Sequence, residues 1–227
     1  MKRSETKGVC AYCKKEIPKN QSSILNHLSQ CDERKNKKKP SLTRHIVLIL
    51  EGAYAPDYWL VIKARPNTTM QTIDGFIKDI WVECCGHMSR FSDGNSEIAF
   101  SKKAGNVFFK GVTVNYEYDF GTPTEVSLSF LGEIDDSDDT SIQVLFRNKE
   151  IEVKCSYCGN RATEICPSCI GEEEGLLCES CKKTHECVEE NGEDYLLPLV
   201  NSPRAGECGY TGSFDKDIKK YFPREII

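Results

Sequence analysis

Hydrophobic patterns that predict regular secondary structure are concentrated between residues 42 and 147. Apolar runs at Thr43–Leu50 and Tyr58–Ala64, separated by a segment with glycine and proline, predict two strands and a turn. From Thr68 to Cys84 the apolar residues follow a helical period, which predicts one long helix. Further strand-like segments lie at Glu97–Phe100, Asn106–Phe109, Val112–Tyr118, Glu125–Ile134 and Ser141–Phe146. This order predicts an α+β fold with one main helix laid across a mixed sheet.

Two weaker apolar patterns lie near the C-terminus. Tyr195–Val200 is an apolar run that we expect to pair with or pack on the central sheet. A short terminal helix with one apolar side is predicted from the spacing of Phe214, Ile218, Tyr221 and Phe222.

Composition narrows the class of protein. The chain is 39% hydrophobic and 29% charged, which is typical of a soluble globular protein. It has no run of about 18 apolar residues that would predict a transmembrane helix, and Met1–Lys7 lacks the apolar core of a secretory signal. We therefore expect a cytoplasmic protein, where its 13 cysteines would stay reduced and favour metal binding over disulfides.

The first cysteine cluster lies near the N-terminus. Cys10 and Cys13 flank a two-residue turn, so both thiolates can point at one metal ion. A short helix ending at about Cys31 would place His27 and Cys31 on one face toward that turn. These four ligands resemble a Cys-Cys-His-Cys zinc finger that covers residues 8–31.

The predicted finger is too small to fold by hydrophobic burial alone. Ser22 or Ser23 is expected to cap its helix, and Ile24 and Leu28 would form a minimal core. A segment of roughly 30 residues cannot bury enough apolar surface, so metal binding and folding of the finger are expected to be coupled.

A larger cluster of paired ligands fills 33 residues of the C-terminal third. Their paired spacing predicts two tetrahedral zinc ions with structural roles, because full sulfur and nitrogen coordination leaves no position for a reactive water. Four-thiolate geometry also admits iron. The residues are Cys155, Cys158, Cys166, Cys169, Cys178, Cys181, His185 and Cys187.

The order of these pairs, together with Leu176-Leu177, resembles a B-box, and MYND-type fingers are the next most similar modules. The resemblance covers residues 155–187 and implies a cross-brace, in which alternate pairs share a metal. It implies Cys155, Cys158, Cys178 and Cys181 for one ion, and Cys166, Cys169, His185 and Cys187 for the other. B-boxes usually end in His, and His185 and Cys187 are only two residues apart, so Cys208 is an alternative to Cys187 as the last ligand.

Four elements of the central region also carry a resemblance, namely His45–Leu50, Tyr58-Trp59, His87 with Phe91, and Tyr116–Gly121. Together they resemble the plasmid-ORF-three-like family, which is also catalogued as TnpR-type passenger proteins of insertion elements. The resemblance covers about residues 42–150 and implies a β-grasp-like α+β fold and an association with mobile elements. It implies no activity, and Thr122-Pro123 stand where the family has Asp and Trp.

Charge is distributed unevenly along the chain. Residues 1–40 carry eleven Lys and Arg against four Asp and Glu, whereas residues 41–150 and 151–227 are each net acidic by six charges. We divide the chain into a zinc finger (1–33), a basic linker (34–41), an α+β region (42–150) and a double-zinc cross-brace with a C-terminal extension packed on the core (151–227). The basic head predicts contact with nucleic acid phosphates through Lys14, Lys15, Lys19 and the run 34–39, with Tyr12 as a stacking ring.

Function is predicted from these modules. We expect about three structural zinc ions and a non-enzymatic interaction protein that binds nucleic acid through its head and a protein through its acidic C-terminal module. The alternatives are an adaptor that binds proteins only, and an enzyme of unknown chemistry in the central region. For the enzyme, His87 beside Cys84 and Cys85 would supply a thiol nucleophile, although packed cysteines and a surface histidine are the simpler interpretation. We expect Asp119 to cap a turn.

Overall fold

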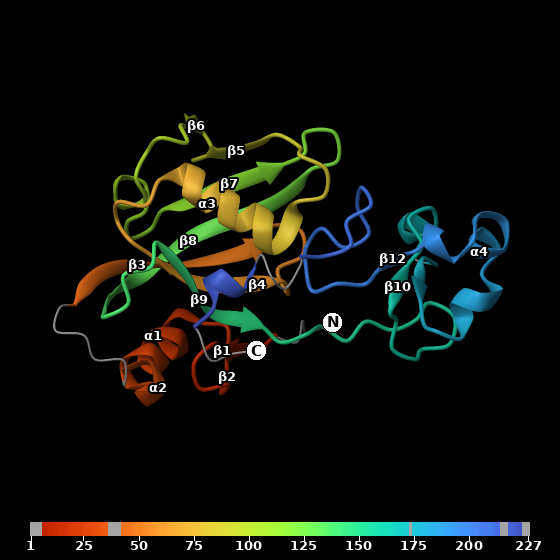
Figure 1. Cartoon of the computed structure of the whole chain (residues 1–227), viewed down its shortest axis with the longest axis horizontal. Coiled ribbons are helices and arrows are strands. Elements are labelled where there is room, and N and C mark those ends of the chain that lie inside the picture. Colours follow the sequence, from red (N-terminus) through yellow and green to blue (C-terminus); the bar gives the residue numbers. More distant parts are fainter. Residues whose placement is uncertain (1–5, 36–41, 173, 214–217, 224–227) are drawn as a thin grey trace.

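The computed structural model describes residues 6–35, 42–172, 174–213 and 218–223. Its largest element is a nine-stranded sheet with the order β2-β1-β9-β4-β3-β8-β7-β5-β6 (Figure 1). All pairs of neighbouring strands in this sheet are antiparallel. The strands are β1 (Gly8–Cys10), β2 (Glu16–Ile17), β3 (Thr43–Gly52), β4 (Trp59–Ala64), β5 (Ser89–Ser92), β6 (Glu97–Ile98), β7 (Thr113–Tyr118), β8 (Thr124–Asp136) and β9 (Ile142–Asn148).

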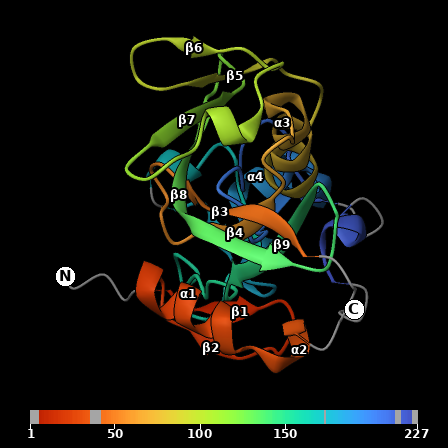
Figure 2. The ribbon, with the colours of Figure 1, turned by 90° about the vertical axis from the view of Figure 1, so that its left-hand side faces the viewer.

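Helices cover both faces of the central strands. On one face lies α3 (Met70–Ile77), which continues into a π-helical turn at Lys78–Val82. The other face is covered by α1 (Gln21–Gln30), which is followed by the short α2 (Asp32–Lys35). Figure 2 shows the sheet between these two layers.

This arrangement explains why β3 and β4 are buried along most of their length. Side chains of a strand alternate between the two faces of a sheet. In β3, Leu48 and Leu50 belong to the core beneath α3, whereas Val47 and Ile49 belong to the core beneath α1. A strand buried on both faces has no polar face and reads as a continuous apolar run.

The N-terminal finger, residues 8–31, is therefore joined to the main sheet. Its strand β1 pairs with β9, with Gly8 opposite Asn148 and Cys10 opposite Phe146. Its helix begins after Asn20, whose side-chain oxygen accepts the backbone N–H of Ser23 at 2.8 Å. The predicted caps Ser22 and Ser23 instead lie inside the first turn of α1.

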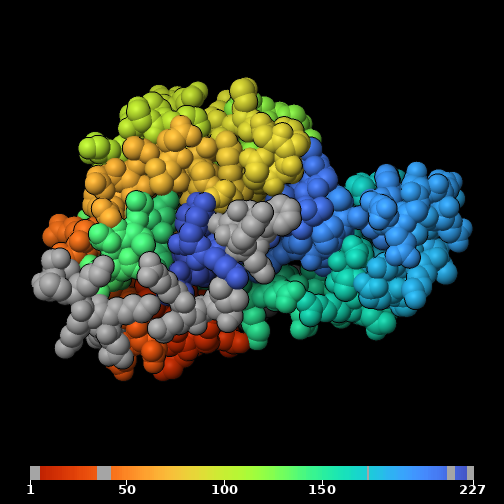
Figure 3. Space-filling view, viewed as in Figure 1, coloured from red at the N-terminus to blue at the C-terminus, as the bar shows by residue number. Residues whose placement is uncertain are grey.

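The cross-brace module, residues 155–198, projects from one end of the body (Figures 1 and 3). A three-stranded sheet with the order β11-β10-β12 lies at its base. Its strands are β10 (Glu164–Ile165), β11 (Leu176–Leu177) and β12 (Leu197–Pro198), and its helix is α4 (Glu186–Asn191). Short 3-10 turns lie at Ala104–Asn106 in the body, at Ile170–Glu172, Cys181–Thr184 and Glu193–Tyr195 around the module, and at Lys219–Tyr221 near the C-terminus.

The predicted α+β class is confirmed in part, because strands dominate and the sheet is antiparallel instead of mixed. The strand predicted at Asn106–Phe109 is wrong. A 3-10 turn at Ala104–Asn106 leads into this segment, and the backbone N–H of Phe108 bonds the carbonyl of Ala104. Phe108, just after this turn, is buried. The sequence of a short apolar run does not by itself distinguish a strand from a buried turn.

One prediction near the C-terminus requires correction, and another lies partly outside the described residues. The run Tyr195–Val200 contributes β12, but this strand pairs with β10 of the module and not with the central sheet. Phe214 lies outside the described residues. Tyr221, in contrast, packs against the core through an edge-on contact of its ring with Phe76, with centroids 4.8 Å apart. Within the described part of the chain, no helix is both long and apolar enough to cross a membrane.

Candidate metal centres

Cys and His side chains of the described residues converge in four groups, each of which could hold a metal ion. In every group the candidate ligand atoms lie within 4.8 Å of one another. Three of the groups contain the ligands expected from the sequence, and the fourth combines residues that the sequence analysis kept apart. The groups are Cys10, Cys13, His27 and Cys31; Cys155, Cys158, Cys178 and Cys181; Cys166, Cys169, His185 and Cys187; and Cys84, Cys85, His87 and Cys208.

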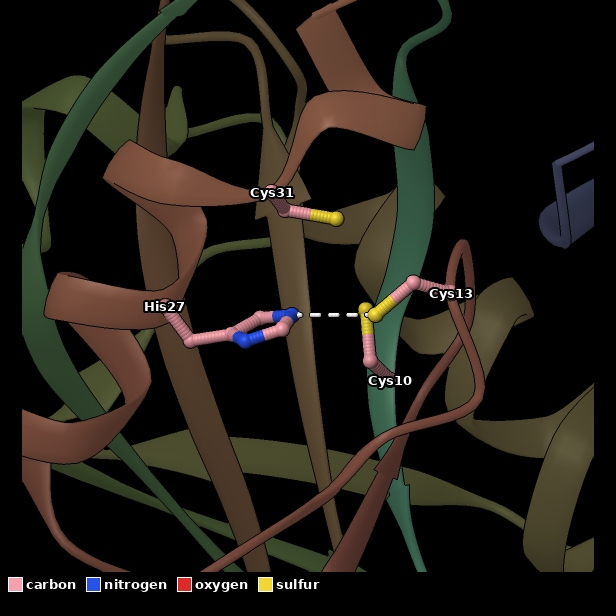
Figure 4. A group of neighbouring side chains, drawn as sticks. All are labelled: Cys10, Cys13, His27 and Cys31. Atoms are coloured by element: carbon pink, nitrogen blue, oxygen red, sulfur yellow. Dashed lines mark hydrogen bonds between the residues drawn. The ribbon is translucent and has the colours of Figure 1, made fainter.

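The finger group is assembled from a hairpin turn and a helix (Figure 4). Cys10 ends β1, and Cys13 lies in the turn that follows, where Lys14 adopts a positive φ of 61°. His27 lies in the last turn of α1, and Cys31 is its C-cap. His27 Nε2 lies 3.4 Å from Cys13 Sγ. All four side chains point toward a common centre between the turn and the helix.

Burial sets the protonation of these ligands before a metal binds. It raises the pKa of the Cys10 thiol to about 12, so that this thiol is neutral at pH 7 without a metal. Burial also lowers the pKa of His27, which favours the neutral imidazole that can bind a metal. A metal that binds here must therefore displace protons from the thiols, and its affinity should fall as the pH falls.

The module brings together the same two sets of four that the cross-brace resemblance implies. Cys155 and Cys158 flank a turn before β10, and Cys178 and Cys181 follow β11. Cys158 Sγ lies 3.5 Å from Cys178 Sγ. Pairs from separate parts of the module thus share one centre.

The second module group lies between β10 and α4. Cys166 follows β10, His185 is the N-cap of α4, and Cys187 lies in its first turn. Cys169 Sγ lies 3.6 Å from Cys187 Sγ. Of the two candidates that the sequence left open for the last position, the structure places Cys187 in this group and Cys208 in another.

His185 provides a separate indication that this group fits a metal. Its Nδ1 lies 3.4 Å from the hydroxyl of Tyr157, which fixes the orientation of the ring. Its Nε2 is buried and has no hydrogen-bond partner among the described residues. A buried polar nitrogen without a partner is costly, and a metal ion at the centre of the group would satisfy it.

The spacing of the sulfur atoms suits zinc. A tetrahedral ion with Zn–S bonds of about 2.3 Å separates its ligand sulfurs by roughly 3.8 Å. The Sγ–Sγ distances of 3.5 Å in the first module group and 3.6 Å in the second are close to this edge length. The donor atoms are thiolate sulfur and imidazole nitrogen, which zinc prefers and which other thiophilic metals also accept.

Thiol protonation differs within the first module group. A hydrogen bond with Ser180 Oγ lowers the pKa of Cys178 to about 6, so that this sulfur is mostly a thiolate at pH 7. The contact of Cys181 with Cys158 raises the pKa of Cys181 to about 12. One preformed thiolate beside neutral thiols offers an incoming cation a first ligand, after which the others lose their protons.

The fourth group was not predicted from the sequence. Cys84 and Cys85 follow the π-helical turn, whereas Cys208 comes from the segment that returns from the module to the body. Cys85 Sγ lies 3.8 Å from Cys208 Sγ although the two residues are 123 positions apart. The adjacent cysteines and His87 were the signal within the sequence, but the remaining ligand can be found only through the fold.

The same residues include those considered for a nucleophilic enzyme. Asp119 Oδ2 lies 3.4 Å from His87 Nε2, and Cys85 Sγ lies 2.9 Å from the same nitrogen. A nucleophile, histidine and acid relay uses the two ring nitrogens separately. Because both contacts are made to Nε2, this arrangement is not that of a relay. Asp119 also accepts the backbone N–H groups of Gly121 and Thr122, which confirms its predicted role in the turn.

Comparisons with known proteins give little further information. No family model matches the chain, and no curated protein matches it. One solved structure that resembles it is a protein of unknown function, MM3350 from Methanosarcina mazei Go1, with a TM-score of 0.39 and 15% sequence identity. The match covers 47% of this chain and 68% of that one. Similarity at this level does not establish a common fold.

Proposed function

We propose that this chain is a zinc-stabilised, non-enzymatic interaction protein whose projecting module binds a protein partner. The observation that carries the proposal is the composition of the ligand groups. Each provides four sulfur or nitrogen donors, which saturate a tetrahedral ion and leave no position for a substrate or a reactive water. Ions held in this way stabilise a fold, so the function of the module should reside in its surface.

The surface of the module suits a basic protein segment. Tyr157 is 55% exposed and Ile170 is 36% exposed, so the module presents two large apolar side chains to solvent. A hollow of about 320 Å³ lies beside Tyr157, with Glu174 and Glu186 in its wall. Its other lining residues are Thr184 and the candidate metal ligands Cys169, Cys181, His185 and Cys187, so only its outer part, at the two glutamates, is offered to a partner. An aromatic ring next to carboxylates can hold the apolar stem and the charged head of Lys or Arg.

Nucleic-acid binding by the head is the second candidate, and the contacts favour it less. Lys19 forms an ion pair with Glu51, and Arg34 pairs with Asp136 at 3.1 Å, so these charges are neutralised within the protein. The hydroxyl of Tyr12 donates to Gln143, which holds the ring that was predicted to stack on bases. Within the described part of the head, Lys14 and Lys15 are exposed and make no ion pair, and they remain candidates for phosphate contacts.

Three expectations remain predictions. The run at 36–39 lies outside the described residues, so its phosphate contacts are argued from charge alone. The association with mobile elements depends only on the resemblance of the central region, and the same holds for the β-grasp-like arrangement. An enzyme in the central region stays the third candidate, although its best constellation lacks the geometry of a relay.

Binding of two probes to the zinc-loaded full chain separates the first two candidates. One probe is a labelled peptide rich in Lys and Arg, and the other is a mixed-sequence single-stranded DNA, each titrated at low and moderate salt. We expect the peptide to bind, and the double variant Glu174→Gln with Glu186→Gln to weaken it at least threefold. The matched control is Lys14→Ala with Lys15→Ala, which should leave peptide binding unchanged.

The opposite pattern would overturn the proposal. Tight DNA binding with a steep salt dependence that is lost in the lysine variant would assign the head as a nucleic-acid finger. Peptide affinity that is equal in the wild-type chain and the glutamate variant would remove the acidic hollow as the binding site. Deleting the whole head is a poor test, because α1 covers one face of the central sheet.

A further inference from the structure

We infer that Cys84, Cys85, His87 and Cys208 bind a fourth zinc-class ion, and that this ion acts as a clasp holding the return segment of the chain against the body. The return segment is defined as residues 199–208, which leads from β12 back to the π-helical turn. This inference is independent of the proposed function, because it concerns a metal site and not the binding surface of the module.

The donor atoms of this group have the spacing of ligands around a single ion. His87 Nε2 lies 2.9 Å from Cys85 Sγ and 3.2 Å from Cys208 Sγ. Cys85 Sγ lies 3.7 Å from Cys84 Sγ and 3.8 Å from Cys208 Sγ. The sulfur separations match the edge of about 3.8 Å expected around tetrahedral zinc. Three thiolates and one imidazole nitrogen also form the same donor set as the finger group.

The backbone around Cys208 is bent so as to bring its sulfur to this centre. Cys208 has a φ of 46°, and Gly206 and Gly209 on either side have φ values of 89° and 68°. A residue with a Cβ rarely adopts the left-handed region, because the conformation is strained. The strain at Cys208 places an otherwise exposed side chain against His87 and Cys85.

The loop that carries the other ligands is held in place by hydrogen bonds. The hydroxyl of Tyr118 accepts the backbone N–H of Cys84 at 3.4 Å and of His87 at 3.3 Å. The same hydroxyl donates to Glu83 at 3.0 Å, and Glu83 also accepts the backbone N–H of Gly86. These contacts fix the loop from residue 83 to residue 87 before a metal arrives, which reduces the ordering that binding requires.

Arg204 supplies the positive charge that three thiolates require. Its side chain is fully buried, and its Nη2 donates to Cys84 Sγ at 3.4 Å and to Asp119 Oδ2 at 2.7 Å. Its guanidinium also lies over the ring of Tyr118, 4.9 Å from the centroid. A divalent ion with three thiolates carries one net negative charge, and the nearby guanidinium offsets that charge.

The position of Cys208 gives the ion its role as a clasp. Ser202 Oγ donates to the carbonyl of Trp81 at 2.6 Å, and Arg204 Nη1 donates to Thr124 Oγ1 at 2.9 Å. The return segment therefore enters the body through buried hydrogen bonds and ends at the metal group. Because Cys84, Cys85 and His87 belong to the body and Cys208 to the segment that leaves the module, an ion between them would tie that segment to the body.

Alkylation of the wild-type protein tests the inference without a variant. Cys85 and Cys208 are both exposed, so free thiols at these positions should react rapidly with N-ethylmaleimide. We expect the zinc-loaded chain to protect both residues, and a chelator to increase their modification at least tenfold, as measured by peptide mass spectrometry. Rapid modification of both residues that is the same with and without the chelator would overturn the inference.

The number of bound ions provides the second test. Native mass spectrometry of the reduced full chain should show four zinc ions, and the variant Cys208→Ser should show three. The control Glu207→Gln changes the neighbouring residue and should keep four. Amide hydrogens of the return segment should exchange faster in Cys208→Ser than in the control. Equal zinc counts in the wild-type chain and Cys208→Ser, or a disulfide between Cys85 and Cys208 under reducing conditions, would contradict the clasp.

Discussion

The N-terminal finger and the cross-brace module bring together the same kinds of candidate metal ligand, but they obtain their hydrophobic cores in different ways. In the finger, Ile24 and Leu28 are fully buried against residues of the main sheet such as Trp59 and Val61. The module has a core of four buried residues, one of which is the candidate ligand Cys166. We therefore expect its fold to depend on metal to a greater degree than that of the finger.

This difference shows that a cysteine motif alone does not indicate how much a metal contributes to folding. A small module without an adequate core needs metal to fold at all. A segment whose strand and helix are already packed on a large sheet can keep part of its structure when the metal leaves. We expect the module to unfold without metal. We expect the finger to keep part of its structure without metal and to become fully ordered when the metal binds.

The largest expected effect is the loss of a module ligand. Replacing Cys166 by Ser should abolish the second module site, and structural zinc contributes on the order of 10–16 kcal/mol to the folding of small zinc modules. We expect the module to unfold while the body remains folded. Trypsin should then cleave rapidly after Lys182 or Lys183, and the zinc content should fall.

The control for this variant is Glu189→Gln, which changes an exposed side chain of the same helix as Cys187. It should remain resistant to trypsin under the same conditions. Equal resistance of the two variants would contradict the dependence of the module on metal.

The next largest effect concerns the ionic contact that ties the finger to the body. Asp136 pairs with the buried Lys63 at 3.0 Å and with Arg34, which follows the finger helix, at 3.1 Å. Burial alone would raise the pKa of Asp136, but the hydrogen bond from the backbone N–H of Asp138 and the charge of Lys63 lower it below its usual value. Replacing Asp136 by Asn leaves Lys63 buried without a counter-charge and should lower the free energy of unfolding by about 3–5 kcal/mol.

Urea unfolding of the full chain measures this effect. The matched control is Asp135→Asn, which alters the preceding, exposed carboxylate and should change the free energy by less than about 0.5 kcal/mol. If both variants lost the same small amount, the ionic contact of Asp136 with Lys63 and Arg34 would not contribute to stability as this account requires.

A smaller effect is expected where strand β1 of the finger meets the body. A Cβ added at Gly8 would lie 2.2 Å from Cη2 of the buried Trp59 ring, so the strand must shift or the ring must move. Gly8→Ala should therefore reduce the free energy of unfolding by about 1–3 kcal/mol.

At Gly75 in α3, a Cβ meets no atom within 4 Å, and Gly75→Ala should stabilise the chain by about 0.4–1 kcal/mol. A comparison of their melting temperatures checks the opposite signs, and matching shifts would contradict the close packing at Gly8.

The smallest effect is a pH dependence that originates beside the same ionic contact. Burial, together with the charge of Lys63, lowers the pKa of His45 below its usual value of 6.5. The unfolded chain therefore binds this proton at a higher pH than the folded chain does. Stability is retained above about pH 6.5 and falls as the pH decreases, by at most about 1.4 kcal/mol per pH unit.

Unfolding of the wild-type chain and of His45→Gln between pH 7.5 and 5.5, at saturating zinc, isolates this contribution. Protons that displace metal affect both proteins equally, so the difference between their slopes belongs to His45. The variant should show the shallower decline, and identical slopes would remove His45 as its source.

Much of the metal chemistry could be predicted from the sequence because the ligands of three groups are close together in the chain. Cys10 and Cys13, or Cys166 and Cys169, flank a single turn, and the resemblance to a cross-brace implied which pairs of the module share a centre. The packing of the finger was less evident, although a signal existed. The run from Ile46 to Leu50 has no polar positions, which indicates a strand covered on both faces by some other part of the chain.

The fourth group could not be assembled from local patterns, because its ligands come from segments joined only by the fold. A count of residues would have pointed to it. The three predicted groups use ten of the 13 cysteines and two of the four histidines, which leaves Cys84, Cys85 and Cys208 with His45 and His87. Burial then shows which of the two histidines can join the cysteines, since His45 lies in the core and His87 is near the surface.

The dependence of the module on metal is tested most directly by hydrogen exchange of the full chain before and after removal of zinc by a chelator. We predict that amides of residues 155–198 lose their protection, whereas those of β3, β4 and α3 keep theirs and those of β1 and α1 lose it only in part. Equal loss in the finger and the module, or full protection of the module without zinc, would contradict this account.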